Sequence, residues 1–346
     1  MEKERARGNK EDNAMKISVI VVAWNRKILL QKNLLHASQF RNTFDEMIVV
    51  DNGSTDRTAE MVKDQFPWAR LIRLPRNYGI LEARNIGALN NNGDLLLFLD
   101  DDGCFDFSAL RSMEDHFEKD KSLGVLSGRV VDLPREDVFN LRFDEYRPKE
   151  PRVYYSDRYK GGVSLIRKQT FLEAGMLPGH FFYGTEERDF SLRAFKKGYK
   201  VMVFNGAVLL HKKGIQRHQN KRFYSFHYRN RLFQIWRNLP SGPALLETLL
   251  TLSAGFLASL YTGNFFPFLR GTVGGFLRLP RILHSERDPL TLEEYRTFRE
   301  RCGDQLDFSK RFSGLLRNIS IQKGKRLMRF MVFAFVFIRV GLHEPF

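Results

Sequence analysis

Residues 95–103 read Leu-Leu-Leu-Phe-Leu-Asp-Asp-Asp-Gly, and no other segment indicates the fold so directly. Five successive apolar residues predict a strand buried on both faces, as in the centre of a parallel sheet. Asp100, Asp101 and Asp102 would then lie at the C-terminal edge of the sheet, where open α/β sheets bind ligands. Because adjacent carboxylates repel one another, we expect Mn²⁺ or Mg²⁺ to bind them. An acidic, solvated turn is the alternative interpretation.

The segments before residue 95 predict further strands that alternate with helices. Strands are expected at residues 17–23, 47–50 and 69–74. Alternation of this kind predicts βαβ units and a mostly parallel sheet flanked by helices. The polar residues that follow these strands are Asn25, Asp51, Asn77 and, in the next turn, Gly79. They would meet along one edge of the sheet as nucleotide contacts, although polar residues are also ordinary in turns.

The sequence lacks the usual glycine-rich phosphate loops. No Gly-x4-Gly-Lys-Ser/Thr segment occurs, and no Rossmann glycine fingerprint follows the first predicted strand. We therefore expect a metal ion on the acidic triplet to hold phosphates. Gly162, at the start of a later predicted strand, would let a ligand approach the backbone, unless it marks only a bulge.

A second acidic cluster, at residues 184–193, predicts the start of a helix. Thr185 is expected to cap this helix, and Asp189 and Arg193 are spaced as an i,i+4 pair. Glu186 and Glu187 could point into a cleft, where one of them would act as a general base.

His211 follows another apolar strand and could complete a metal site begun by Asp102, with a purely structural role as the alternative. A basic segment with many aromatic residues comes next. Its Arg229 and Asn230 are candidates for contacts with phosphate or with the acceptor substrate of a group-transfer reaction.

Taken in order, these segments resemble the family-2 inverting glycosyltransferases of the GT-A fold. The resemblance covers about residues 16–238. The segments that carry it are Ser-Val-Ile-Val-Val at 18–22 with Asn25, Val-Asp-Asn-Gly-Ser-Thr-Asp at 50–56, Asn-Tyr-Gly at 77–79, Ala-Arg-Asn-Ile-Gly at 83–87, Phe-Leu-Asp-Asp-Asp at 98–102, Gly175, Glu-Glu-Arg-Asp-Phe at 186–190, Arg193, Gly-Tyr at 198–199 and His211.

The resemblance implies roles for individual residues. Asp51 would accept from the imide N–H of uracil or thymine, Arg84 would approach the base or diphosphate, and Asp100 would contact the ribose. Asp102 and His211 would ligate the metal ion. Glu187 stands where the family usually has the aspartate that deprotonates the acceptor. Because the pair here is Glu-Glu instead of Glu-Asp, Glu186 is the alternative base.

The charge of the chain is concentrated in its second half. Residues 196–346 hold 26 Lys and Arg but only 9 Asp and Glu, which suggests an anionic partner. The segment 248–269 is uncharged and near the length of a membrane span, but Pro267 interrupts it. An apolar segment at 330–338 follows a cluster of cations. These features suit a peripheral or monotopic protein on an anionic membrane surface, with a spanning helix, or helices packed on the catalytic domain or on a second subunit, as alternatives.

We therefore predict a disordered tail at 1–15, a GT-A domain at 16–240 and a helical, membrane-associating region at 241–346. Two cysteines fit a reducing compartment, which favours the cytoplasmic face of the cell membrane. The expected enzyme is a metal-dependent, hexosyltransferase-type glycosyltransferase that uses a UDP- or dTDP-sugar. Its acceptor would be a glycan or a lipid-linked molecule, in the synthesis of surface polysaccharide or glycolipid. Oligomers are possible, and no nucleic-acid partner is expected.

Other classes are open to test. A sugar-nucleotide-forming nucleotidyltransferase should carry a basic, glycine-rich loop after the first strand, and residues 23–27 do not resemble one. A non-catalytic protein that binds nucleic acid or another anionic polymer would explain the charge, but no known reader motif occurs. An inactive scaffold is disfavoured because the acidic triplet, the Glu pair and His211 are all present.

Overall fold

The computed structural model describes residues 15–133, 137–212 and 221–303. The described residues up to Arg301 form a first compact unit. The strands are β1 (Ile17–Ala23), β2 (Glu46–Asp51), β3 (Arg70–Arg73), β4 (Leu95–Asp100), β5 (Gly103–Phe105), β6 (Leu123–Leu133), β7 (Val153–Tyr155), β8 (Val163–Arg167) and β9 (Lys200–Lys212). The helices are α2 (Lys27–Ser38), α3 (Thr58–Gln65), α4 (Ile80–Leu89), α5 (Leu110–Lys119), α6 (Lys168–Glu173), α7 (Glu186–Lys196), α8 (Lys221–Asn238), α9 (Ser241–Thr262), α10 (Phe265–Ser285) and α11 (Leu292–Cys302).

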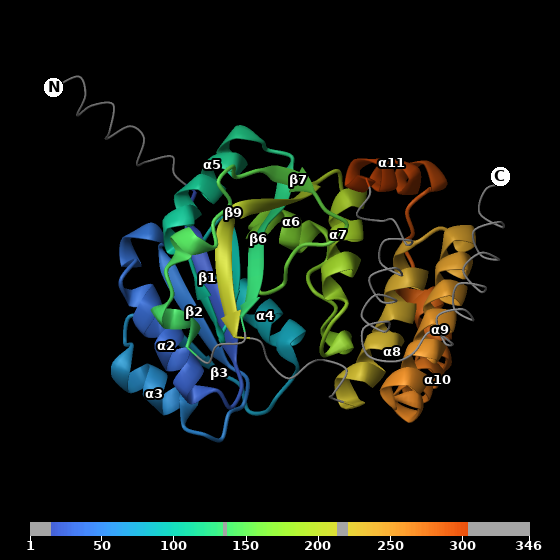
Figure 1. Ribbon diagram of the computed structural model, residues 1–346, viewed down its shortest axis with the longest axis horizontal. Coiled ribbons are helices and arrows are strands. Elements are labelled where there is room, and N and C mark those ends of the chain that lie inside the picture. The colour runs from blue at the N-terminus through green and yellow to red at the C-terminus, as the bar shows by residue number, and fades with distance from the viewer. Residues whose placement is uncertain (1–14, 134–136, 213–220, 304–346) are drawn as a thin grey trace. The chain divides into compact units, whose positions relative to one another are not determined.

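A single mixed sheet runs through the first unit, in the order β3-β2-β1-β4-β8-β6-β9-β5, with β7 paired to β9 (Figure 1). The first four of these strands are parallel, β8 runs antiparallel to both of its neighbours, and β6 and β9 are parallel. The prediction of a mostly parallel α/β sheet is therefore confirmed, as are the strands at 17–23, 47–50 and 95–99.

Helices cover both faces of this sheet. Alternate residues of β1 enter two different cores: Val19 and Val21 join one, and Ile20 and Val22 join the other. The first core takes its helical side chains from α2, α3 and α5, whereas α4, α6 and α7 supply the second. β1 and β4 are buried on both sides, and their sequences are apolar except for Ser18 and the terminal Asp100, as the centre of a three-layer α/β/α arrangement requires.

Helices α8 and α10 extend the helical layer that covers the second core beyond α7. Phe233 of α8 and Ile282 of α10 join the second core, and Figure 1 shows α8 on the side of α7 away from the sheet. Pro267, expected to interrupt an apolar helix, lies in the first turn of α10, after α9 has ended at Thr262. The predicted tail, the apolar segment at 330–338 and its preceding cations lie outside the described residues, apart from Met15.

The start of α7 differs from the sequence-based expectation. Thr185 makes no capping hydrogen bond, so the prediction that it caps the helix is wrong. Its backbone is left-handed, with φ of 67°, and its hydroxyl does not reach the helix amides. The carbonyls of the turn before it, at Tyr183 and Gly184, instead accept from the Asn230 amide of α8 at 2.8 and 3.2 Å. Thus α8 holds the turn that leads into α7.

Asp189 fixes α7 against α8 more firmly than its i,i+4 spacing suggests. The carboxylate is fully buried and pairs with Arg193 at 2.7 Å, as the sequence predicts, and with Arg237 at 3.3 Å. Asn238 also donates to it, at 2.7 Å. Burial would raise the pKa of Asp189, but the two guanidinium groups outweigh that effect and lower it below its usual range.

We expect Asp189→Asn to destabilise the fold by about 3–5 kcal/mol, because it removes the buried carboxylate that two largely buried guanidinium groups share, and only Arg237 keeps another one, Glu286 at 3.8 Å. The measurement is urea unfolding of the variant and the wild type from pH 7 to pH 3. Since the pKa of Asp189 is depressed in the folded state, the difference should be constant above about pH 5 and should shrink as the pH falls below about 4. The exposed pair Glu150–Arg152 gives the control: Glu150→Gln should cost less than about 1 kcal/mol. Equal effects of the two substitutions would contradict the assignment.

Candidate active site

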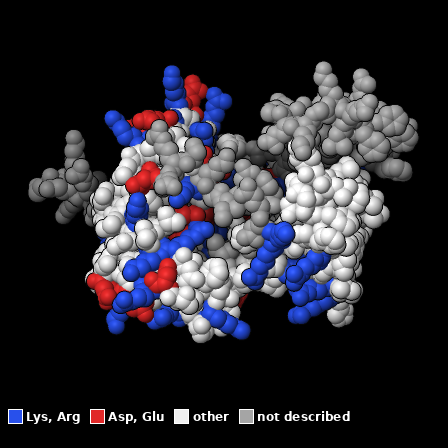
Figure 2. Space-filling model, turned by 60° about the horizontal axis from the view of Figure 1, so that its bottom comes forward, with Lys and Arg blue, Asp and Glu red and all other residues white. Residues whose placement is uncertain are grey.

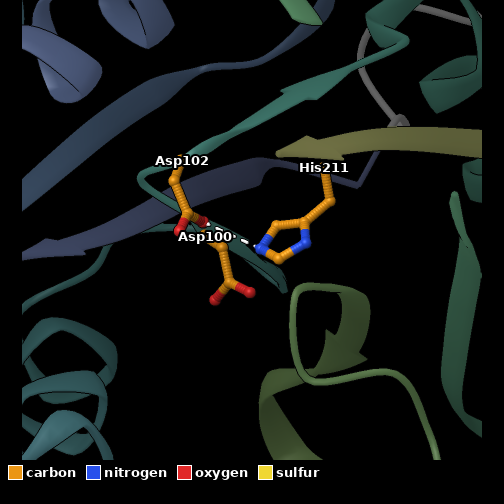
Figure 3. Close-up of side chains that lie close together, drawn as sticks. All are labelled: Asp100, Asp102 and His211. Carbon is orange, nitrogen blue, oxygen red and sulfur yellow. Dashed lines mark ion pairs between the residues drawn. The ribbon is translucent and has the colours of Figure 1, made fainter. Parts of the chain in front are cut away.

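A group of three potential metal ligands lies where β4 and β9 end. Asp100 ends β4, Asp102 follows in the turn to β5, and His211 lies near the end of β9. One ligand atom from each residue lies within 4.8 Å of the other two, and Figure 3 shows the three side chains directed toward one another. His211 Nε2 lies 3.1 Å from Asp102 Oδ1. β5 and β9 bring them together, because Gly103 pairs with His211 in the antiparallel ladder.

Two further residues support this group, and the sequence analysis missed both. Asp132, opposite His211 in the parallel pair of β6 and β9, accepts from His211 Nδ1 at 2.7 Å. A carboxylate on the second ring nitrogen is the arrangement that usually orients a metal-binding histidine. Arg26 bridges Asp101, at 3.0 Å, and Asp102.

Charges at the acidic triplet are strongly coupled. Burial, together with the charges of Asp102 and Asp100, raises the pKa of Asp101 to about 7, although Arg26 acts in the opposite direction. Burial would also raise the pKa of Asp102, but His211 and Arg26 lower it below its usual range. The hydrogen bond to Asp102 raises the pKa of His211 to about 9. The acidic triplet therefore attracts positive charge, and its cationic partners in the structure are His211 and Arg26.

The residues fit a divalent cation. Two carboxylates and an imidazole suit Mn²⁺ or Mg²⁺ when substrate phosphates supply further oxygen ligands. If a metal ion replaced the proton on His211 Nε2, the contact of Nδ1 with Asp132 would still orient the ring. Asp100, Asp102 and His211 are thus the residues that would hold the ion.

The glutamate pair approaches the same region from α7. Arg84 Nη2 donates to Asp100 Oδ1 at 2.8 Å, and Nη1 lies 4.0 Å from Glu186 Oε1. A Cβ atom added to Gly161 would lie 3.3 Å from Glu187 Oε1 and 3.5 Å from Glu186 Oε1. Both carboxylates therefore face the backbone just before β8.

Gly162 lies directly beside the acidic triplet. A Cβ atom there would lie 2.6 Å from Asp100 Oδ2, so a side chain would displace this carboxylate. Glycine at 162 thus permits the close packing of β8 against the end of β4. The structure therefore brings Asp100, Arg84 and the glutamate pair around residues 161–162.

Asp51 lies at the same edge of the sheet, two strands from Asp100. Val22 of β1 is opposite Val50 on one side and Asp100 on the other, so about 10 Å separates the two outer strands. Asp51 is fully buried; Oδ1 accepts from the Ser54 amide at 3.0 Å. Within the described part of the chain, Oδ2 accepts no hydrogen bond, although Arg73 Nε lies 3.9 Å from it.

A hollow of about 330 Å³, a size found in small-ligand sites, lies at the residues that follow β2 and β3. It is lined by Gly53, Ser54, Thr55, Arg73, Leu74 and Pro75. Asp51 is buried and is not among the lining residues, so the hollow and the unsatisfied Asp51 oxygen are two separate features of this sheet edge.

Asn25, Asn77 and Gly79 shape the loops at this edge. Asn25 Oδ1 accepts from the Thr55 amide at 2.8 Å, and Asn77 Oδ1 accepts from the Gly79 amide at 2.8 Å. Gly79 has a φ of +89°, and a Cβ atom there would lie 2.6 Å from the Phe182 carbonyl oxygen. Their expected contacts with a nucleotide stay predictions.

Arg229 and Asn230 lie behind the glutamate turn. Asn230 is fully buried and donates to the Phe181 and Tyr183 carbonyls, and Arg229 donates to Phe181 at 2.8 Å. Burial lowers the pKa of Arg229 to about 10. These contacts position the segment before Glu186. A direct contact of either residue with acceptor or phosphate stays a prediction.

Comparison with known proteins agrees with this geometry. Residues 18–183 match the family model described as glycosyl transferase family 2. An uncharacterized glycosyltransferase of Haemophilus influenzae is 28% identical over 186 residues, which cover 52% of this chain and 62% of that protein. A dolichyl-phosphate beta-glucosyltransferase of Dictyostelium discoideum is 33% identical over 141 residues, 36% of this chain and 43% of that protein. The chain thus spans less than two thirds of these curated relatives.

A solved structure shares the fold. The mannosyltransferase PcManGT of Pyrobaculum calidifontis, solved in complex with GDP-Man and Mn²⁺, superposes with a TM-score of 0.52 and 16% identity. The likeness covers 76% of this chain and 87% of that one. It therefore includes elements beyond the segment that the family model matches.

Proposed function

We propose that the chain, whose residues 18–183 match glycosyl transferase family 2, is a GT-A-fold enzyme that transfers a sugar from a nucleoside-diphosphate sugar to a hydroxyl group, with inversion of the anomeric carbon. The observation that carries this proposal is the convergence of two groups at one sheet edge. Asp100, Asp102 and His211 form the first, and the carboxylates of Glu186 and Glu187 beside Gly161 form the second. Arg84 joins the two through its contacts with Asp100 and Glu186.

The first group binds the diphosphate end of the donor. A divalent cation held by Asp100, Asp102 and His211 would offset the negative charge that develops on the leaving diphosphate. Arg84 is buried, and its positive charge is retained because the carboxylates of Asp100 and Glu186 raise its pKa despite burial. It therefore supplies a second, fixed positive charge beside Asp100. Arg26, which is half-exposed, can move from the triplet toward a bound phosphate.

The second group activates the acceptor. Glu187 is the more exposed of the two glutamates, whereas Glu186 is buried near Arg84. We assign Glu187 as the general base that takes the proton of the acceptor hydroxyl. The acceptor oxygen then attacks the anomeric carbon as the bond to the diphosphate breaks, and this single displacement inverts the configuration. Glu186 orients Arg84.

Asp51 binds the base of the donor. The free Oδ2 of Asp51 is an acceptor that matches the imide N–H of uracil or thymine, so the donor is a UDP- or dTDP-sugar. We expect Asp51→Asn to weaken UDP binding about 10- to 100-fold, because an ionic hydrogen bond contributes about 1.5–3 kcal/mol. Isothermal titration with UDP and GDP checks this. The variant should lose most of the preference for UDP, and an unchanged preference would remove Asp51 from the base site.

The acceptor is proposed to be a glycan or lipid-linked molecule at the cytoplasmic face of the membrane, in the synthesis of surface polysaccharide or glycolipid. The apolar and basic C-terminal half supports this, as does the lipid substrate named for the Dictyostelium relative. The experiment is incubation with labelled sugar nucleotides and extracted membrane lipids, with Mn²⁺ or EDTA. Label should enter the lipid fraction only with the metal, and NMR of the product should show the inverted anomer. Transfer with retention, or transfer in EDTA, would contradict the proposal.

A further inference from the structure

Helices α9 and α10 present a broad apolar face to solvent. Their exposed large side chains are Leu245, Leu246, Leu249, Phe256 and Leu260 on α9, and Phe266, Leu269, Val273, Phe276, Leu277 and Leu283 on α10. Phe266 is 79% exposed and Leu277 is 77% exposed. A contiguous apolar area on two neighbouring helices marks an interaction surface rather than scattered surface residues.

The opposite side of α9 is fixed to the glycosyltransferase fold. Glu247 pairs with Arg188 of α7 and with Arg231 of α8, and Trp236 Nε1 donates to Thr248 at 3.0 Å. Burial would raise the pKa of Glu247, but the two guanidinium groups lower it to about 2. Moving α9 away from the fold would separate this buried ion network, so α9 stays alongside α7 and α8.

α10 is packed just as closely. A Cβ atom at Gly271 would lie 2.3 Å from the Ser225 carbonyl oxygen, and one at Gly275 would lie 2.7 Å from Leu232 Cδ1. Both glycines therefore bring the backbone of α10 against α8. By length and composition α9 could cross a membrane. Because α9 and α10 are packed against the fold on one side, only their outer faces can contact a membrane.

The charges around the apolar face select its partner. Residues 248–285 contain no acidic residue, and Arg270, Arg278 and Arg281 of α10 are all exposed. At 100° per residue, Arg270 and Arg281 lie on one margin of the apolar stripe of α10. Figure 2 shows the right-hand part of the surface largely without charged side chains, with Lys and Arg side chains at its edge. A second copy docked here would place arginines together without acids, whereas anionic lipid headgroups would neutralise them.

We infer that α9 and α10 dock side-on into the surface of an anionic bilayer, with their apolar side chains among the acyl chains and the arginines at the headgroups. Neither helix crosses the membrane. This inference rests on the proposed membrane location and specifies the surface that provides it.

The test is sedimentation of the full chain with vesicles of phosphatidylcholine, alone or with about one third phosphatidylglycerol. The wild type should bind the anionic vesicles and be released by carbonate. The double variant Phe266→Gln, Leu277→Gln should bind at least about tenfold more weakly, because two exposed apolar side chains are lost. Arg270→Gln should weaken binding to the anionic vesicles about fivefold and leave binding to the neutral ones unchanged.

The matched control is Leu35→Gln, Leu89→Gln, which removes two exposed leucines from α2 and α4 and should leave vesicle binding unchanged. Unaltered binding of the Phe266/Leu277 variant would overturn the inference. A wild-type protein that carbonate does not release from the vesicles, and that only detergent releases, would also overturn it. The face would instead be assigned to a second copy if the wild type binds no vesicles and forms a dimer, and if the Phe266/Leu277 substitutions abolish that dimer. Nucleotide binding without vesicles reports separately on the proposed reaction, and the Phe266/Leu277 variant should retain it.

Discussion

Asp102→Asn is expected to lower sugar transfer about 100- to 1,000-fold, the usual effect of removing one group that stabilises charge in the transition state. Asp102 is the residue that links His211 and Arg26, and it lies within reach of Asp100. An amide in its place is a poorer ligand for a hard cation and carries no charge. The measurement is kcat at saturating donor and Mn²⁺, together with Mn²⁺ affinity from electron paramagnetic resonance of the free ion.

Two matched variants separate this effect from loss of the fold. Asp64→Asn makes the same chemical change on the exposed side of α3 and should leave both measurements unchanged. Asp132→Asn, which removes the partner of His211, should lower Mn²⁺ affinity about 10- to 100-fold. A folded Asp102→Asn protein with wild-type turnover would end the metal assignment.

Glu187→Gln is expected to lower kcat about 10²- to 10⁴-fold, because glutamine cannot take the proton of the acceptor hydroxyl. Donor affinity should change little, because we assign Glu187 to the acceptor and the base of the donor to Asp51, which lies two strands away from Asp100. Single-turnover transfer and donor titration on the same sample measure the two quantities. The thermal midpoint should be close to that of the wild type, because the side chain is partly exposed.

Glu186→Gln distinguishes the two candidate bases. Glu186 is buried 4.0 Å from Arg84, so its loss should weaken donor binding and leave a measurable rate of transfer. If Glu186→Gln has the larger effect on kcat and Glu187→Gln remains active, the base is Glu186 and the assignment must be exchanged.

The sequence predicted the sheet well because its signals are local. Apolar runs such as those of β1 and β4 report burial on both faces within a few residues, and the acids that follow report the strand end. The placement of Asp51 and Asp100 at one edge then follows from the parallel connections. For the same reason His211 could be assigned to the strand end before the structure was known.

Contacts across long sequence separations were the ones that the sequence did not reveal. Arg26 reaches Asp102 from 76 positions away, and Asp132 reaches His211 across 79. No periodicity encodes such pairs. The hydroxyl of Thr185 matched the composition of a helix cap, yet the left-handed backbone there prevents capping. Glu247 is the one charged residue of α9, and it pairs with Arg188, 59 positions before it.

Metal-dependent nucleotide binding tests the central claim most directly, because it needs neither the acceptor nor a membrane. Calorimetric titration of the protein with UDP, dTDP, GDP and ADP, in Mn²⁺ and again in EDTA, is the measurement. The account predicts binding of UDP or dTDP in Mn²⁺, with loss of most of the affinity in EDTA and in the Asp102→Asn variant. Equal affinity in EDTA, or no binding of any of the four nucleotides in Mn²⁺, would contradict it.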